Sequence, residues 1–333
     1  MLSNLLAGAV LACIALPAVA QTTTAPGMIV SKRIAGPDGG WDYASVDPAS
    51  HRLFVARGDG VMTVDLGTGA VTPQLVAAGR THSAFVIPGS NTGVVTSSTS
   101  GGTYLFDATT GKVTADIKTG QKPDAAVYNP DDKMLYVMNA GDGVISIIDP
   151  IAAKQVAKIV VGGTLEFAAL DGKGHLFVNI EDKNELATID LKTRTVLRRT
   201  KLAGCEEPSG LAYTKGGALI SSCGNGVATV VEARSGRQLA SVAIGAHPDA
   251  VLYDAGRDRA YVPAGGDGTL TVIDTSSVPR AIGTVLTQKS ARTGAVDPAT
   301  GNVYLPAARY APAVGTARPQ SEPGSFEVLV VSK

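Results

Sequence analysis

The sequence predicts an all-β fold, a seven-bladed β-propeller with four antiparallel strands in each blade. Three observations lead to this prediction: a repeat of about 42 residues, four strand-like runs in each repeat, and many residues that favour turns. Glycine accounts for 39 of the 333 residues, whereas aromatic residues make up only 5% of the chain. Small side chains and frequent turns are typical of short connected strands rather than of helices.

An acidic residue that closes a β-type run sets the register of the repeat. Successive copies lie 42, 42, 41, 42 and 42 residues apart, a spacing that chance does not hold over six copies. The six residues are Asp65, Asp107, Asp149, Asp190, Glu232 and Asp274. In the third repeat the strand-like runs are 125–128, 134–138, 144–148 and 155–161. Four strands in about 42 residues are the mark of a propeller blade.

The strand count also predicts how the ring of blades closes. The seven first strands begin near Asp42, His82, Asp124, Glu166, Ser209, Asp249 and Arg292. The seventh repeat lacks a run for its fourth strand, but the N-terminal run IVSKRIAG at 29–36 reads like the fourth-strand run QVAKIVVGG at 155–163. We therefore expect residues 29–36 to complete the last blade and leave no open sheet edge there. Residues 21–333 are predicted to form a single domain.

The first twenty residues are predicted to be a signal peptide. An apolar run from Leu5 to Leu16 is followed by AVA at 18–20, an A-x-A cleavage site before Gln21. The run is too short to remain as a membrane span, so we expect a periplasmic or secreted protein with no span in the mature chain. An uncleaved apolar segment and a lipoprotein site at Cys13 are the alternatives.

Two cysteines remain once Cys13 is removed with that segment. Cys205 lies just before the first strand of blade five and Cys223 ends its second strand, so antiparallel pairing brings the two together. In an exported protein such a pair predicts a disulfide bond. A redox or metal-binding thiol pair is the alternative, but no CxxC spacing or histidine cluster supports it.

The repeats resemble the YVTN-type repeat of YncE-like seven-bladed propellers. The runs LYVMNAGDGVISIIDP at 135–150 and RAYVPAGGDGTLTVIDT at 259–275 carry this resemblance, which covers essentially the whole chain after the first twenty residues. It implies the same fold and an exported bacterial protein. It does not specify one activity, because the broader group includes binding proteins, lactonase-like enzymes and haem-carrying relatives.

The starts of the first strands are the main candidate for a functional site. Innermost strands line the central channel of a propeller, and their starts share one face, so seven side chains are expected to form a ring at the channel mouth. One interpretation is structural, because an aspartate at a strand start can accept N–H bonds from the neighbouring blade. The other is functional, because this ring mixes different chemistries. Its members are Asp42, His82, Asp124, Glu166, Ser209, Asp249 and Arg292.

Three ring residues are predicted to be catalytic or to bind a cation: Glu166, Asp124 and His82. Carboxylates that lie close together without basic partners raise each other's pKa or recruit a cation, and oxygen ligands would favour Ca²⁺ or Mg²⁺. Arg292 lies between Asp249 and Asp42 in the ring and is expected to pair with both. Loops between second and third strands share this face. The predicted ligand-binding set is Asp42, Asp249, Arg292, Ser209, Arg57, Asn179 and Glu181.

Charge excludes one class of function and leaves two. The formal net charge is zero and no dense Lys/Arg cluster is present, so the chain has no bulk electrostatic attraction to nucleic acid or to an anionic membrane. We favour a monomeric exported protein that binds a small molecule or a protein partner at the channel mouth. The alternative is a small-molecule hydrolase or lyase, lactonase-like or acting on sugar acids, with ring carboxylates as acid and base. The long loop at 309–325 is a candidate lid over the mouth or a mere excursion.

Overall fold

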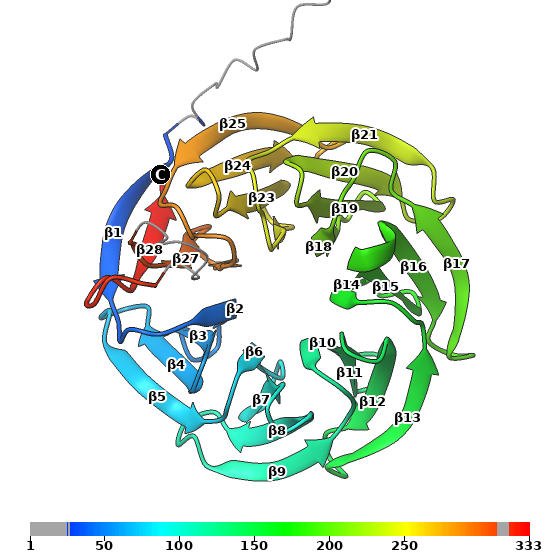
Figure 1. The fold of residues 1–333 in the computed structure, drawn as a ribbon, viewed down its shortest axis with the longest axis horizontal. Helices are drawn as coiled ribbons and strands as arrows, with labels where there is room; N and C mark the ends of the chain where they lie inside the picture. Colours follow the sequence, from blue (N-terminus) through cyan, green and yellow to red (C-terminus); the bar gives the residue numbers. More distant parts are fainter. Residues whose placement is uncertain (1–24, 26, 312–319) are drawn as a thin grey trace, which may run out of the picture.

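Seven four-stranded antiparallel sheets surround a central channel, as the sequence predicts (Figure 1). The computed structural model describes residues 25, 27–311 and 320–333. Blade one contains β2 (Trp41–Asp47), β3 (Arg52–Arg57), β4 (Gly60–Asp65) and β5 (Val71–Ala77). Blade two contains β6 (Thr81–Val86), β7 (Thr92–Ser97), β8 (Gly102–Asp107) and β9 (Val113–Lys118). Blade three contains β10 (Pro123–Asn129), β11 (Met134–Asn139), β12 (Val144–Asp149) and β13 (Lys154–Val160).

The next three blades repeat this arrangement, with the first strand at the channel and the fourth at the rim. Blade four contains β14 (Leu165–Leu170), β15 (His175–Ile180), β16 (Glu185–Asp190) and β17 (Thr195–Lys201). Blade five contains β18 (Pro208–Tyr213), β19 (Ala218–Cys223), β20 (Val227–Glu232) and β21 (Gln238–Ala243). Blade six contains β22 (Leu252–Asp254), β23 (Arg259–Ala264), β24 (Thr269–Asp274) and β25 (Arg280–Leu286).

The seventh blade combines both ends of the described chain. Three of its strands come from the C-terminal part, namely β26 (Ala295–Val296), β27 (Val303–Ala307) and β28 (Glu327–Ser332). The fourth is β1 (Ile29–Ala35), which pairs antiparallel with β28 so that Ile29 lies opposite Ser332 and Ala35 opposite Glu327. Figure 1 shows the blue β1 beside the red β28. The predicted closure by residues 29–36 is therefore confirmed.

Burial explains why the second and third strands are almost continuously apolar. In β11, five of the six residues of MLYVMN are buried, because neighbouring blades cover both faces of this strand. The outermost strands have one exposed face, and β13 accordingly alternates exposed and more buried residues. The apolar core thus lies between the blades rather than in one central mass.

The acidic residue that sets the repeat has a structural role in the turn after the third strand. Asp65 ends β4, and its Oδ1 accepts hydrogen bonds from the Thr68 N–H at 2.7 Å and the Thr68 hydroxyl at 2.8 Å. These bonds favour the ionised carboxylate and hold the pKa of Asp65 below its ordinary value. Asp107 and Thr110 repeat the arrangement in blade two. The six-fold acidic pattern is therefore a turn cap, distinct from the acids at the channel.

Blade five carries the predicted disulfide between Cys205 and Cys223. Cys223 is the last residue of β19 and lies opposite Pro208, the first residue of β18. The bond closes a loop with a sequence separation of 18 residues, which the chain-entropy model values at about 3 kcal/mol.

Two sets of expectations fall outside the described residues. These are the signal peptide, with its cleavage site and Cys13, and residues 312–319 of the long loop. The single helical element in the described ranges is a 3-10 turn, η1 (Glu181–Lys183). None of the described helical residues forms a span long and apolar enough to cross a bilayer.

Removing β1 should destabilise the whole ring. A chain that begins at residue 37 loses the backbone hydrogen bonds to β28 and exposes the edge of blade seven. We expect it to aggregate, or to unfold at least about 10 °C below a control chain that begins at residue 25. Differential scanning calorimetry measures both. Equal unfolding temperatures would mean that closure by β1 contributes nothing to stability.

Candidate functional site

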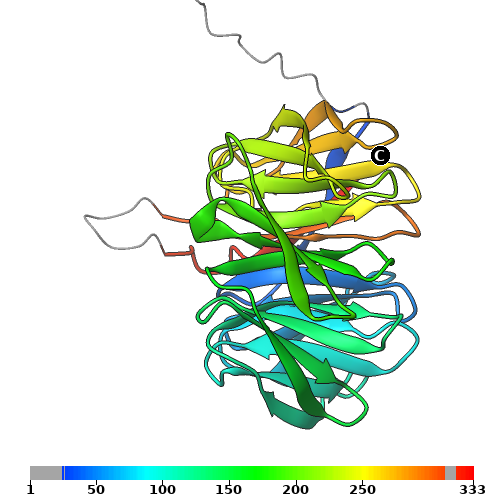
Figure 2. The same ribbon diagram turned by 90° about the vertical axis from the view of Figure 1, so that its right-hand side faces the viewer.

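Strand register places the predicted ring residues on one face of the disc. Five of them, Asp42, His82, Asp124, Glu166 and Ser209, are the second residue of a first strand. The residue before each of them pairs with the end of the second strand, as Trp41 pairs with Arg57. Asp249 and Arg292 precede the short strands β22 and β26. The loop after each second strand therefore lies at the same mouth, and Figure 2 shows one such loop, η1, on a flat face of the disc.

Hydroxyl groups at this mouth donate to the backbone carbonyls of ring residues in neighbouring blades. The Thr293 hydroxyl of blade seven donates to the Asp42 carbonyl of blade one at 2.7 Å. The Thr96 hydroxyl of blade two donates to the Asp124 carbonyl of blade three at 2.7 Å. Across the described residues, no backbone N–H donates to a carboxylate of the ring. The structural interpretation, in which these acids cap the neighbouring blade, therefore does not describe this ring.

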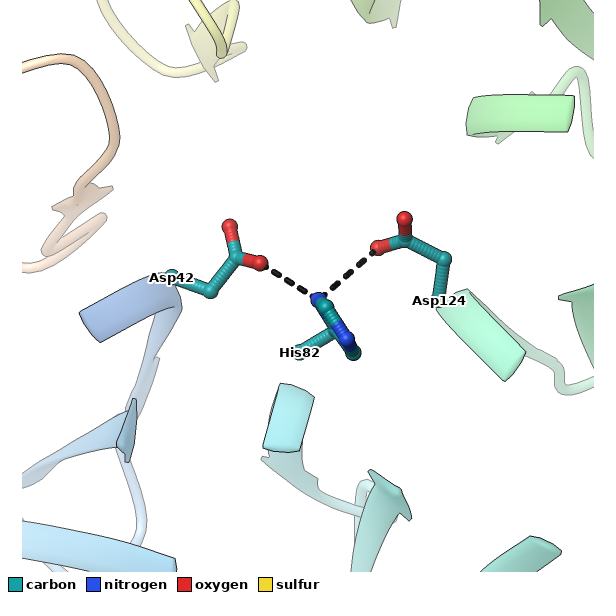
Figure 3. Close-up of side chains that lie close together, drawn as sticks. All are labelled: Asp42, His82 and Asp124. Carbon is teal, nitrogen blue, oxygen red and sulfur yellow. Dashed lines mark hydrogen bonds and ion pairs between the residues drawn. The ribbon is translucent and has the colours of Figure 1, made fainter. Parts of the chain in front are cut away.

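His82 lies between two carboxyl groups from the adjacent blades (Figure 3). Its Nδ1 is 2.6 Å from Asp42 Oδ2 and 3.7 Å from Asp124 Oδ1. Its other ring nitrogen, Nε2, is 2.6 Å from the Ser98 hydroxyl. Burial alone disfavours the protonated ring, but the Asp42 hydrogen bond and the charge of Asp124 outweigh it and raise the pKa of His82. Both nitrogens of this half-buried imidazole are thus engaged.

Asp124 and Glu166 are acids without a hydrogen-bonded basic partner among the described residues. Burial raises the pKa of Asp124, and the charge of Asp42 adds to the effect. Its Oδ1 is buried and accepts no hydrogen bond from the described residues. Burial likewise raises the pKa of Glu166, with the charge of Asp124 as the next cause. Glu166 forms no ion pair or hydrogen bond through its side chain within the described part of the chain.

Arg292 pairs with only one of its two expected partners. Its Nε donates to Asp249 Oδ2 at 3.0 Å, whereas its second nitrogen donates to the Trp41 carbonyl at 3.0 Å. The expected direct pair with Asp42 is not formed, because the Asp42 carboxylate is bound to His82. Burial and the charge of Asp42 still raise the pKa of Asp249, in spite of the arginine.

An aromatic pair lies directly below the ring. Tyr43 and Phe167 follow Asp42 and Glu166 in the chain, and their rings meet across the channel in a T-shaped contact with centroids 5.1 Å apart. Deeper in the channel is a cavity of about 400 Å³ with a largely apolar lining that includes both aromatic residues. Burial, together with the nearby ring carboxyl groups, raises the pKa of Tyr43 well above its usual range. The ring carboxyl groups therefore lie above largely apolar side chains, which do not supply the polar contacts that would offset burial.

The loop residues predicted from the sequence divide into two kinds. Glu181 in η1 is close enough to add to the raised pKa of Asp124, Glu166 and Asp249, so it belongs to the same acidic group. Arg57 is buried away from that group, with its guanidinium 3.6 Å from the Phe326 ring centroid and 2.6 Å from the Pro37 carbonyl.

The other two predicted ligand-binding residues are engaged in contacts between blades. The Asn179 amide donates to the carbonyls of Ser209 and Gly210 at 3.1 Å each. The Ser209 hydroxyl donates to the Pro248 carbonyl at 3.1 Å. Both side chains are buried, and their polar atoms already have protein partners.

Sequence reasoning missed Ser98. It belongs to the loop between β7 and β8, which register places at the mouth, since Thr81 pairs with Ser97. That loop is the blade-two counterpart of the loop that carries Glu181 in blade four. Only the position of Ser98 in a loop at the channel mouth could have identified it from the sequence. Its residue type could not, because the turn contains several serines.

The same residues offer ligands for a metal ion. One ligand atom from each of Asp42, His82 and Asp124 lies within 4.8 Å of the others. Two carboxylates would suit Ca²⁺ or Mg²⁺, and the imidazole would suit a transition metal. A bound cation would also satisfy the buried Asp124 Oδ1.

Comparison with known proteins supports the fold and leaves the family open. No family model and no curated protein matches this chain. Among solved structures, hydrazine synthase of Kuenenia stuttgartiensis superposes with a TM-score of 0.71 at 18% identity, covering 81% of this chain and 93% of that one. A chain of a mitotic checkpoint complex superposes with a TM-score of 0.75 at 13% identity, covering 99% of each chain. At these identities the likeness shows the propeller fold alone.

The raised carboxyl pKa values predict an unusual pH dependence of stability. A folded-state pKa above the unfolded value, about 4.3 for glutamate, means that the folded protein binds the proton more tightly. Stability is then greatest below the unfolded pKa and is lost as the pH rises toward the folded pKa. The raised pKa of His82 acts in the same direction from about pH 6.5 upward.

We expect the unfolding temperature of the ligand-free protein to fall from about pH 5 to about pH 8. Glu166→Gln should reduce this fall, because the amide cannot ionise. Asp116→Asn, which removes an exposed carboxylate on the rim strand β9, is the matched control and should follow the wild type. A wild-type unfolding temperature that rises over this range would contradict the assignment.

Proposed function

We propose that this protein is an exported, YncE-like propeller that binds a small positively charged ligand at the channel mouth. The observation that supports this best is the buried Asp124 Oδ1, which accepts no hydrogen bond from the described residues. An ionised carboxylate in such a place is costly unless a cation or a donor supplies the missing interaction. Burial also raises the pKa of Glu166, so a cation would have to displace its proton to bind the carboxylate.

Charge balance at the mouth favours the same class of ligand. Five carboxyl groups lie there. Burial raises the pKa values of Asp124, Glu166 and Asp249, and the charges of Asp42 and Glu181 add to this effect. The basic side chains among them are His82, held by Asp42, and Arg292, held by Asp249. A divalent cation or a small amine would replace the protons that these acids otherwise retain. An anionic ligand would meet repulsion from those of the acids that are ionised.

Two observations support export. The disulfide between Cys205 and Cys223 is compatible with an oxidising compartment. The sequence supplies an apolar N-terminal run that ends at an A-x-A site before Gln21.

Isothermal titration with Ca²⁺, Mg²⁺ and putrescine tests the binding proposal. We expect one of these cations to bind the wild type, with a binding enthalpy that changes with the ionisation enthalpy of the buffer because protons are released. Affinity should rise with pH between about 5 and 8, as the acids deprotonate. Glu166→Gln should weaken binding about tenfold or more.

The control variant is Glu185→Gln, which alters a carboxylate paired with Arg199 and Lys201 on the outer strand β17. It should bind like the wild type. Absence of binding for all three cations, or equal affinity in Glu166→Gln, would refute the proposed ligand class. Elemental analysis of the purified protein separates a resident metal from an organic cation.

A further inference from the structure

We propose that Ser98, His82 and Asp42 form a nucleophile–base relay that hydrolyses neutral or cationic carboxylic esters at the channel mouth. This goes beyond ligand binding and does not depend on a bound cation. It rests on three side chains from two neighbouring blades whose hydrogen bonds run in series.

The geometry matches what acyl transfer to a serine requires. Ser98 Oγ is 2.6 Å from His82 Nε2, within the range for proton transfer from a nucleophile to its base. His82 Nδ1, on the opposite side of the same ring, is 2.6 Å from Asp42 Oδ2. Nucleophile, base and orienting carboxylate are thus in consecutive contact, an arrangement recognised by geometry and role rather than by chain order.

Hydrogen-bond chemistry fixes the direction of the relay. An ionised carboxylate can only accept, so Nδ1 must carry the hydrogen that faces Asp42. In the neutral ring Nε2 then has a free lone pair, which accepts the Ser98 hydroxyl hydrogen. Asp42 therefore acts as a positioning residue that holds the tautomer in which His82 can serve as a base.

Ser98 is held in place and open to solvent. It is only partly buried, and its backbone N–H donates to the Arg80 carbonyl at 3.0 Å, which anchors the start of the β7–β8 loop. The next N–H, of Thr99, has no acceptor among the residues that the structure describes. A backbone donor directly after the nucleophile is one of the groups that stabilise an oxyanion in other serine hydrolases.

The chemistry balances with water as the only co-reactant. Ser98 Oγ attacks the ester carbonyl carbon while its proton passes to His82 Nε2. The bond from carbon to the alcohol oxygen then breaks, and that oxygen takes the proton from Nε2. Water attacks the resulting acyl-serine with His82 again as base, which releases the carboxylic acid and restores the serine hydroxyl.

The surroundings define the substrate class. Asp124 Oδ1 lies 3.7 Å from His82 Nδ1, and the charges of Asp42 and Asp249 also act on this part of the mouth. An ester that carries its own carboxylate would be repelled, whereas a neutral or positively charged one would not. We therefore expect p-nitrophenyl acetate to react faster than p-nitrophenyl hydrogen succinate.

The direct test is covalent labelling of the full-length protein with a fluorophosphonate, followed by peptide mass spectrometry. The wild type should be labelled on Ser98 and should hydrolyse p-nitrophenyl acetate. Ser98→Ala should lose the label and at least about 100-fold of the hydrolysis rate. Ser100→Ala removes a hydroxyl of the same loop that lies next to Ser97 and not next to His82, so it should keep both.

The variant Asp42→Asn gives a second test, because it should change the reaction only if the Ser98 hydroxyl takes part in catalysis. An amide in place of the carboxylate can donate to His82 Nδ1, which favours the tautomer with the hydrogen on Nε2 and leaves no lone pair there for the Ser98 hydroxyl. The residual hydrolysis should then show a lower kcat with KM little changed, and Ser98 should be labelled more slowly, with the unfolding temperature measured in parallel. A folded wild type that takes no label, or a Ser98→Ala variant that is labelled equally, would overturn the relay. Neither result bears on cation binding, which titration measures separately.

Discussion

The hydrogen bonds that join neighbouring blades at the channel determine what the channel mouth can do. They run from hydroxyl groups such as Thr293 and Thr96 to the backbone carbonyls of Asp42 and Asp124. The first strands are therefore held to the neighbouring blades by hydroxyl groups next to the ring, which donate to the backbone carbonyls of ring residues. Two of the ring carboxyl groups pair with the basic residues of the ring, whereas Asp124 Oδ1 has no hydrogen-bond donor among the described residues.

This division of roles explains the electrostatics of the site. Carboxylates that capped backbone N–H groups would have lowered pKa values, as Asp65 and Asp107 do in their turns. At the mouth the pKa values of Asp124 and Glu166 are raised instead, because burial is not offset by donors. Aspartate thus stabilises the fold in the turns after the third strands. At the channel mouth the same residue type is buried without donors, and a ligand can supply the missing interaction.

The fold could be predicted from the sequence because a propeller repeats its local rules. The acidic turn spacing, closure by residues 29–36 and the pair Cys205 and Cys223 depend on strand register, which periodicity specifies. The location of the ring also depends only on register. The pairing of ring residues with each other cannot be predicted from register, because it depends on how far each side chain reaches. Arg292, for example, donates to the Trp41 carbonyl and not to Asp42.

The contribution of Ser98 could not be predicted for a related reason. Ser98 lies in a loop and His82 at the start of a strand, and their contact depends on the side-chain rotamer of each residue. Neither residue belongs to a motif of fixed spacing. Asn179 shows the converse case. Its position resembled that of a binding residue, but its buried amide bonds to the backbone of blade five. Position at the mouth is thus set by the repeat, whereas function depends on which polar atoms are already satisfied.

The free energies of unfolding of Thr293→Val and Asp124→Asn, measured by denaturant titration at about pH 7.5, test this account most directly. Thr293→Val keeps the side-chain shape but leaves the Asp42 carbonyl without its donor, so it should lower the free energy of unfolding by about 1–3 kcal/mol. Asp124→Asn removes a buried charge with no hydrogen-bond donor on Oδ1, so it should leave the free energy unchanged or raise it. If Asp124→Asn destabilised the protein as much as Thr293→Val, the ring acids would be structural and the central claim would be wrong.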